Sequence, residues 1–164
     1  MSRCIFISDL HLSEQVPEVF DRLQHFLDDL QSSDRLFILG DFFDAWVGDD
    51  DDSPFAAKIQ SALQQTSKRG VRIAIMHGNR DFMIGSDFAA NNQIEILPDP
   101  FLLTLNNQKI LLTHGDQLCS DDVNYLKARA MRMAPEWLAA ARAKSLDERR
   151  QIAVAYRQMS GEAK

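Results

Sequence analysis

The stretch Leu-Phe-Ile-Leu-Gly-Asp at residues 36–41 decides how the fold is interpreted. Four apolar residues in succession predict a strand that is buried on both faces, and Gly40 ends it with a residue that can turn sharply. Asp41 follows at the carboxyl end of this strand, which is where open α/β sheets bind their ligands. The stretch therefore predicts a parallel sheet with a functional carboxylate at its edge.

Strands and helices alternate on both sides of this stretch. Apolar runs at residues 4–7 and 71–76 predict two further buried strands. Apolar residues recur at helical spacing over 20–30 after Pro17, and Ser53 with Pro54 predicts the start of a second helix that Gly70 ends. This order predicts an α/β fold in which crossover helices cover the sheet.

The pattern changes after residue 93. Short strands are predicted at 94–97, 101–105 and 109–113, with Asn106 and Asn107 forming a tight turn between the last two. From Asp121 onward the pattern is helical. Asp121 and Asp122 can cap one helix, Pro135 can open another, and Ser145 with Glu148 forms the capping box of a third.

Composition excludes several classes of protein. The 164 residues are 45% apolar, and the net charge of −6 divides into −11 over residues 1–126 and +5 over residues 127–164. An acidic body argues against a nucleic-acid partner, which would need a basic face. Cys4 and Cys119 are too few for a disulfide framework, so a reducing, cytoplasmic setting is expected. No apolar run approaches the roughly 20 residues of a membrane span.

Polar residues follow four of the predicted strands. They are Asp9 with His11, Asp41, Asn79 with Arg80 and Asp81, and His114. On an extended segment Asp9 and His11 would point the same way, and the two oxygens of Asp41 could bridge two ions. This mixture of oxygen and nitrogen donors suits Mn²⁺, Fe²⁺ or Zn²⁺ better than Ca²⁺ or Mg²⁺.

Each of these blocks alone is more often structural than functional, because Asp-x-His commonly caps a helix and Gly-Asp commonly forms a turn. Here all four blocks lie at the ends of predicted strands, and three of them have a neighbouring glycine. This combination indicates a metal site instead. The acidic run at residues 49–52 is interpreted as a solvated loop.

The blocks D-x-H, G-D, G-N-R-D and T-H-G-D resemble the calcineurin-like metallophosphoesterases. The resemblance implies an αββα sandwich of two mixed sheets flanked by helices, with a core over residues 1–120 and a helical lid insertion over 121–164. It also implies two Mn²⁺ ions, for which the corresponding ligands are Asp9, His11, Asp41, Asn79 and His114.

One family motif is missing. The closing G-H-x-H, which gives a histidine to each metal, does not follow His114. We therefore expect that this chain is a fragment of a longer polypeptide, that its C-terminal strands are missing, and that both metal sites are short of one nitrogen ligand.

Longer stretches, such as Ile-Leu-Gly-Asp-Phe-Phe-Asp-Ala-Trp-Val-Gly-Asp-Asp at residues 38–50, resemble the branch of the family that cleaves the pyrophosphate of a UDP-linked, diacylated glucosamine in lipid A biosynthesis. Asp41, Asn79 and Arg80 are the implied catalytic residues. The implied substrate contacts are Asn79, Arg80, Asp122, Ser160 and Lys164, with Tyr125 and Trp46 as further candidates.

Arg80 points independently to a phosphoanhydride. Many members of the wider family have histidine here, which can protonate an alkoxide leaving group. Arginine cannot donate a proton at ordinary pH, so it suits a phosphate leaving group, which needs none.

The last forty residues mix apolar and basic side chains. The resemblance implies a lid that encloses acyl chains, with basic residues facing phosphates or the anionic surface of the inner membrane. A peripheral, monomeric protein is then expected. A plain helical lid fits the spacing equally well. The alternatives for the whole chain are a general metallophosphoesterase or a catalytically incomplete fragment that binds metal or lipid.

Overall fold

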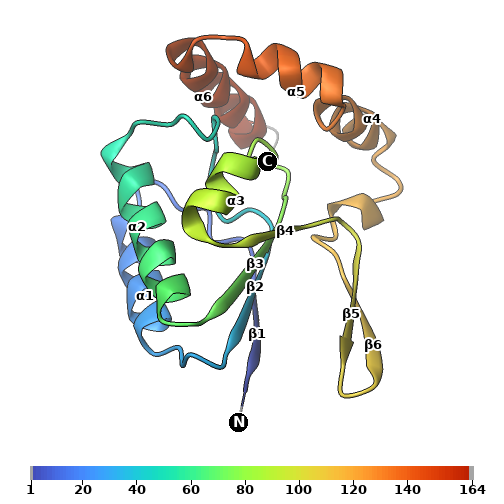
Figure 1. Ribbon diagram of the computed structural model, residues 1–164. Coiled ribbons are helices and arrows are strands. Elements are labelled where there is room, and N and C mark those ends of the chain that lie inside the picture. The colour runs from blue at the N-terminus through green and yellow to red at the C-terminus, as the bar shows by residue number, and fades with distance from the viewer. Residues whose placement is uncertain (1, 163–164) are drawn as a thin grey trace.

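The first half of the chain folds into a parallel sheet with helices against one face. The structure is a computed structural model that describes the backbone of residues 2–162 and the side chains of residues 2–158. The elements in order are β1 (Cys4–Ile7), α1 (Pro17–Asp28), β2 (Arg35–Leu39), α2 (Pro54–Lys68), β3 (Arg72–Met76), α3 (Ser86–Asn92) and β4 (Glu95–Leu97). The strands pair in the order β1-β2-β3-β4, all parallel, and Figure 1 shows α1 and α2 on the same side of the sheet.

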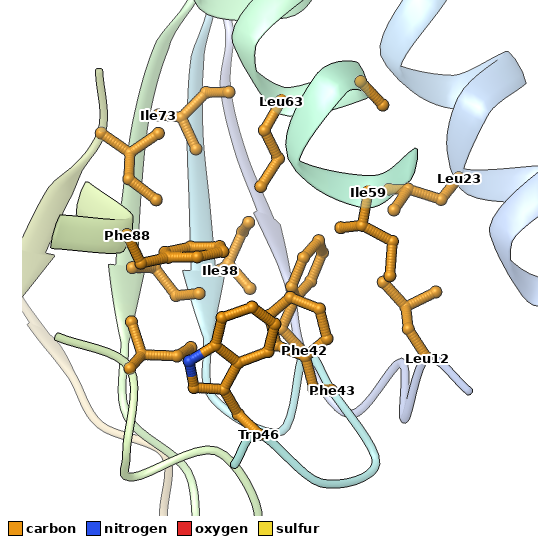
Figure 2. Packing of buried hydrophobic residues seen from close by; sticks show 14 of the residues in the cluster. Leu12, Leu23, Ile38, Phe42, Phe43, Trp46, Ile59, Leu63, Ile73 and Phe88 are labelled. Carbon is orange, nitrogen blue, oxygen red and sulfur yellow. The ribbon is translucent and has the colours of Figure 1, made fainter. Parts of the chain in front are cut away.

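The central strands bury both of their faces. On β2, Ile38 belongs to the large core on the helix side, and Phe37 belongs to a second core on the other side. On β3, Ile75 and Met76 divide in the same way. Figure 2 shows the helix-side core, where Leu63 lies close to the strands. Burial on both faces explains why these strands are continuously apolar rather than alternating.

A hairpin of β5 (Phe101–Leu105) and β6 (Gln108–Leu112) forms the second sheet and covers the second core. Asn106 and Asn107 turn the chain with φ of 49° and 63°, as the sequence predicted. The sandwich of two sheets is confirmed, but within residues 2–162 one sheet is wholly parallel and the other wholly antiparallel, so neither is mixed. The cross-strand neighbours Leu102 and Leu111 lie on the exposed face of the hairpin.

The last third of the described chain is a helical layer, which consists of the single 3₁₀ turn η1 (Asp116–Leu118) and the helices α4 (Val123–Arg132), α5 (Pro135–Arg142) and α6 (Leu146–Glu162). Figure 1 shows α4, α5 and α6 beyond the carboxyl ends of the parallel strands. The predicted caps are confirmed, because Asp122 accepts from Tyr125 N at 2.9 Å and Glu148 N donates to Ser145 Oγ at 3.3 Å. Over residues 2–162 no helix is both long and apolar enough to cross a bilayer.

The acidic run 49–52 is a loop in which Asp50 and Asp52 are exposed, as predicted, but its carboxylates also make specific contacts that the sequence did not indicate. The Asp49 carboxylate accepts from the backbone N of Gly85 and of Phe88 at 2.9 and 3.0 Å, and so caps α3, a helix that the sequence did not indicate. The next three aspartates pair with two arginines of α6: Asp50 with Arg149, and Asp51 and Asp52 with Arg150. These partners lie far along the chain, so the local sequence could not reveal them.

Candidate active site

The loops after β1 and β2 bring three potential metal ligands together. One ligand atom from each of Asp9, His11 and Asp41 lies within 4.8 Å of the others. The loops are joined by backbone hydrogen bonds, from Asp9 N to Gly40 O at 3.1 Å and from His11 N to Asp41 O at 3.0 Å. The expected residues therefore meet at the expected edge of the sheet.

The spacing of Asp9 and His11 predicted an extended backbone. The backbone of the three candidate ligands is instead tightly turned. Asp9, His11 and Asp41 have φ of 57°, 48° and 49°, in the left-handed region that such side chains rarely adopt. A residue held there costs on the order of 1–3 kcal/mol, and such residues concentrate at functional sites. The side chains converge because the loops are tightly turned and paired, rather than because two strand residues share a face.

Asp41 lies between two histidines. Its Oδ2 is 4.0 Å from His11 Nε2, and its Oδ1 is 3.8 Å from His114 Nε2. The Asp41 carboxylate is almost wholly buried, and burial raises its pKa above the ordinary value, partly offset by the hydrogen bond from Arg80 N at 2.9 Å. A cation between these groups would favour the charged form of the carboxylate.

The histidines offer free nitrogen lone pairs. His114 Nδ1 lies 2.9 Å from the carbonyl oxygen of Leu39, which can only accept, so Nδ1 carries the proton and Nε2 is left as a ligand. His11 Nδ1 is buried without a hydrogen-bond partner among the described residues. A buried, unpartnered nitrogen next to carboxylates fits a divalent cation of the transition series, as the donor set predicted.

Two glycines allow the strand ends to pack this closely. A Cβ on Gly40, whose φ is 91°, would lie 2.6 Å from His114 Nδ1, and a Cβ on Gly78 would overlap the Asp41 carboxylate. Only a residue without a side chain fits either position, which confirms the expectation that glycine marks a close approach here.

Asp81 connects the two loops that follow β2 and β3. It is fully buried, and its two oxygens accept from Gly78 N at 2.8 Å and from Phe42 N at 2.7 Å. Burial raises the pKa of Asp81, and the neighbouring charge of Asp41 adds to the effect. The carboxylate thus ties the loop after β2 to the loop after β3.

Asn79 and Arg80 lie where the metal ligands adjoin a large cavity of about 800 Å³. Arg80 Nη1 is 3.8 Å from Asp44 Oδ1, and the same carboxylate forms an ion pair with Arg157 of α6. Both arginines line the cavity. Two guanidinium groups therefore gather beside the candidate metal ligands, where they could bind a phosphate.

The cavity is apolar with a basic rim. Phe82, Trp137, Ile152 and Tyr156 are among its apolar walls, and Phe82 packs edge-on against Trp137 at 5.7 Å between ring centroids. The described lining residues include the basic Arg80, Arg132, Lys144, Arg149 and Arg157, against one acid, Asp44. In a chain of net charge −6, this combination is suited to an anion that carries apolar groups.

Several arginines of the helical layer pair with carboxylates of the protein. Arg149 donates to Val47 O and Asp50, and only 6% of Arg149 is exposed. Arg129 donates to Asp99 and Asp116. In this structure these side chains hold the layer to the body, which differs from the expectation that they face phosphates or a bilayer.

The remaining predicted residues are distributed unevenly. Tyr125 lines the cavity. Trp46 also lines it, although its ring is mainly core, stacked on Phe43 at 4.4 Å and close to Phe88 in Figure 2. Asp122 is exposed at the start of α4. The Ser160 side chain and all of Lys164 lie outside the described residues.

Sequence reasoning gave Asp44, Asp81 and Asp116 no individual role, and it expected Arg129, like the other basic residues of the helical layer, to face phosphates or a bilayer. The first three are acids inside or next to the recognised blocks, in segments that are otherwise apolar or glycine-containing. A buried acid in such a segment requires a donor or a cation, and that was the available signal. Nothing local marks Arg129, because its partners come from two other segments.

The fold is that of the metallophosphoesterases, and three candidate metal ligands lie at its sheet edge. The chain belongs to the calcineurin-like phosphoesterase family, whose sequence profile matches residues 2–162. Members of this family use divalent metal ions, in agreement with the cluster of Asp9, His11 and Asp41.

Particular relatives are more similar. The chain is 41% identical over 160 residues to a UDP-2,3-diacylglucosamine hydrolase of Chromohalobacter salexigens, covering 97% of this chain and 65% of that protein. It is 45% identical over 152 residues to a protein of the same name from Chromobacterium violaceum, covering 90% and 62%. The crystal structure of a protein of unknown function from Aquifex aeolicus aligns with 80% of this chain and 72% of its own, at 15% identity and a TM-score of 0.48. The chain thus spans slightly less than two thirds of the length of these curated relatives.

Proposed function

We propose that this chain provides the metal-binding and lipid-binding parts of a UDP-2,3-diacylglucosamine hydrolase. This enzyme would cleave the pyrophosphate bond of its substrate and release UMP and 2,3-diacylglucosamine 1-phosphate, also called lipid X. The observation that carries the proposal is that Asn79 and Arg80 line a cavity with apolar and basic walls, while the backbone of Arg80 donates to the candidate ligand Asp41. The names of the relatives support the same substrate.

Two Mn²⁺ ions are proposed, with Asp41 as the ligand they share. Asp9 and His11 would complete one site, and Asn79 and His114 would contribute to the other. When bound, such ions neutralise phosphate charge and make water a nucleophile near neutral pH. The positions of His11 and His114 on either side of the Asp41 carboxylate support this division.

Arg80 is proposed to bind the phosphoryl oxygens as charge develops on them. Its guanidinium has two parallel donors that match two phosphate oxygens, and Asp44 holds it at the cavity wall without neutralising the whole rim. Because arginine donates no proton, the residue favours a leaving group that is stable as an anion. Both products of the proposed reaction, UMP and 2,3-diacylglucosamine 1-phosphate, are phosphates, so either one meets this requirement as the leaving group.

The helical layer is proposed to act as a lid over the acyl chains, with residues 1–120 as the catalytic core and 121–164 as the lid. Its cavity of about 800 Å³ lies within the range of roughly 300–1,000 Å³ that is usual for ligand sites. Because the substrate carries acyl chains, we place the protein at the cytoplasmic face of the inner membrane as a peripheral monomer. A general phosphoesterase would have no use for this cavity.

The test is release of UMP from UDP-2,3-diacylglucosamine in the presence of Mn²⁺. The 164-residue chain is compared with the same chain extended by the C-terminal remainder of the Chromobacterium violaceum relative. We expect little turnover by the first sample and metal-dependent turnover by the second, because the added segment is expected to carry the closing G-H-x-H motif of the family. Preference of the extended protein for p-nitrophenyl phosphate over the UDP-lipid would favour a general phosphoesterase and contradict the proposal.

Substitution of Arg80 tests the leaving-group argument in the extended protein. Arg80→Ala should lower kcat far more than it raises KM, because the interaction strengthens in the transition state. Arg80→His should not restore pyrophosphate cleavage, since a proton donor gives no advantage there. Full activity of Arg80→His on the UDP-lipid would show that the argument is wrong.

A further inference from the structure

The guanidinium group of Arg129, on α4, bridges two buried carboxylates that belong to other segments of the chain. Its Nε donates to Asp116 Oδ2 at 2.6 Å, and its Nη2 donates to Asp99 Oδ2 at 2.9 Å. The side chain of Arg129 is 12% exposed, and those of Asp99 and Asp116 are each 7% exposed. Hydrogen bonds between charged groups are strong where little water reaches them. One side chain of the helical layer therefore holds both carboxylates in place.

The two carboxylates in turn hold the loop that carries the candidate metal ligand His114. Asp99 Oδ1 accepts from Thr113 Oγ1 at 2.7 Å and from the backbone N of His114 at 3.4 Å. Asp116 belongs to the same loop, two residues after the histidine. Arg129 thus fixes this loop at two points, directly at Asp116 and indirectly through Asp99.

The position of this loop decides where the His114 ring lies. The ring Nδ1 is 2.9 Å from the Leu39 carbonyl oxygen, and Nε2 is 3.8 Å from Asp41 Oδ1. His114 follows β6 of the antiparallel sheet, whereas Asp41 follows β2 of the parallel sheet. Because the two residues belong to different sheets, strand pairing does not set the distance between them. Contacts that hold the loop after β6 do so instead.

Polar contacts are important for the attachment of α4 itself. None of the residues of α4, all of which the structure describes, is fully buried. Tyr125 Oη donates to the same Asp116 oxygen as Arg129, at 2.6 Å. Without Arg129, the described hydrogen-bond donors to Asp99 and Asp116 would all be neutral. Two buried carboxylates without a cationic partner are costly, so the loop and the helix should both move when Arg129 is removed.

We propose that Arg129 is a positioning residue, which couples the docking of α4 to the position of His114. The helical layer then sets the geometry of one metal site in addition to covering the cavity. By linkage, a cation bound at His114 stabilises the docked position of α4 by the same free energy. The value of this coupling for catalysis rests on the function proposed above.

Hydrogen exchange of the metal-free 164-residue chain, measured by mass spectrometry, tests the positioning without metal or substrate. Arg129→Met removes the guanidinium and keeps an apolar side chain, and we expect exchange to accelerate about tenfold both in α4 and in residues 113–118. The backbone N of His114 and of Leu118 are hydrogen-bonded in this segment, so the change is measurable.

Arg149→Met is the matched control, because it also removes a buried arginine that holds the helical layer to the body. Its contacts are with Val47 and Asp50, and they do not reach His114. It should accelerate exchange in α6 and leave residues 113–118 unchanged. Unchanged exchange at 113–118 in Arg129→Met, or equal acceleration there in both variants, would overturn the proposal.

Mn²⁺ affinity tests the consequence for the metal site. Arg129→Met should weaken Mn²⁺ binding about tenfold, as is usual for residues that orient a metal ligand, and Arg149→Met should not weaken it. Thr113→Val decides the point if Arg129→Met does not fold, because it breaks the bond to Asp99 and leaves the ion pairs of Arg129 in place. Thr113→Val should weaken Mn²⁺ binding without accelerating exchange in α4.

The two proposals fail separately. A wild-type chain that binds no Mn²⁺ would contradict the metal centre of the proposed function, whereas hydrogen exchange at residues 113–118 would still decide the role of Arg129. Wild-type Mn²⁺ affinity in both Arg129→Met and Thr113→Val would overturn the role of Arg129 and leave the proposed function standing.

Discussion

The sheet edge and the helical layer face each other across the cavity, but they are stabilised in different ways. At the sheet edge, positions are set by backbone hydrogen bonds, left-handed residues and the buried carboxylate of Asp81. In the helical layer, Ala141 is the sole apolar side chain among those described that is fully buried. Ion pairs of Arg129, Arg149 and Arg150 hold the layer to the body instead.

The difference indicates how the two regions should respond to change. Ligands on tightly paired loops cannot adjust to a missing partner, so a substitution there should remove metal binding altogether. Helices that are held by ion pairs should respond to a substitution with gradual, local opening, because water can replace part of each ion pair. Under the proposed function the helical layer would have to open for a substrate with acyl chains, and the second kind of attachment would suit that movement.

The largest effect is expected from Asp41→Asn. Loss of a ligand shared by both metal sites should weaken Mn²⁺ binding by more than about a hundredfold, since changes to supporting residues alone typically cost 10- to 100-fold. The chain should still fold, because burial already raises the pKa of Asp41 and a neutral amide is tolerated there. Mn²⁺ titration and thermal unfolding check both points, and retained Mn²⁺ affinity would show that the site is misassigned.

Asp81→Ala should damage the sheet edge through stability rather than through ligand loss. Removing the carboxylate leaves the buried N–H groups of Gly78 and Phe42 without acceptors, at a cost of about 2–4 kcal/mol in the free energy of unfolding. Urea unfolding of the wild type and of Asp81→Ala measures this difference in the free energy of unfolding. Asp87→Ala, at an exposed position in the first turn of α3, is the control and should cost less than about 1 kcal/mol. Equal costs for the two variants would contradict the role of Asp81.

Arg149→Met should act on the helical layer alone. Asp50 is largely exposed and regains water when its partner is removed, so global stability should change little. Amide hydrogen exchange in α6 should accelerate by about tenfold, because the helix loses its bonds to Val47 and Asp50. Lys127→Ala, an exposed position on α4, is the control. Equal acceleration of exchange in β2 and β3 would mean that the two regions unfold as one.

The smallest effect concerns pH. Ion pairs with Arg149 and Arg150 lower the pKa of Asp50 and Asp52 below the ordinary 3.8, so the stability they give the helical layer is present above that value and is lost as pH falls below it. Burial raises the pKa of Asp41 and Asp81, so these two carboxyls are protonated first as the pH falls. Their protonation removes the free-energy cost of burying charge at the sheet edge, and the ion pairs of the helical layer weaken only at lower pH.

Each region contains one of the two tryptophans, which makes this prediction measurable. Trp137 lies in α5 and Trp46 lies in the core. Fluorescence of Trp46→Phe, which reports on Trp137, should change at a higher pH than fluorescence of Trp137→Phe. Coincident transitions would argue against separate attachment of the helical layer.

Much of the site could be predicted because its ligands are encoded locally. Asp9, His11 and Asp41 follow apolar strands of the parallel sheet, and parallel strands end at a common edge. His114 follows the antiparallel strand β6 instead, so its contact with Asp41 is set by the packing of the two sheets. The helix caps at Ser53 and Asp122 were equally readable, because capping depends on a few neighbouring residues. The left-handed conformation of the ligand loops was not predicted, because it is set by pairing between two loops rather than by either loop alone.

The sequence by itself determined the order of strands and helices and the polar residues at the strand ends, including the Gly-Asn-Arg-Asp block that contains Arg80, since these depend on periodicity and short spacings. The tertiary structure alone decided the partners of the charges. Asp49 caps a helix 36 residues further along the chain, Asp50 holds Arg149, and Asp116 holds Tyr125 and Arg129. The physical reason is that a charge has no preferred spacing along the chain: its partner is whichever group of opposite sign or hydrogen-bonding capacity folding brings near, in a setting that excludes water.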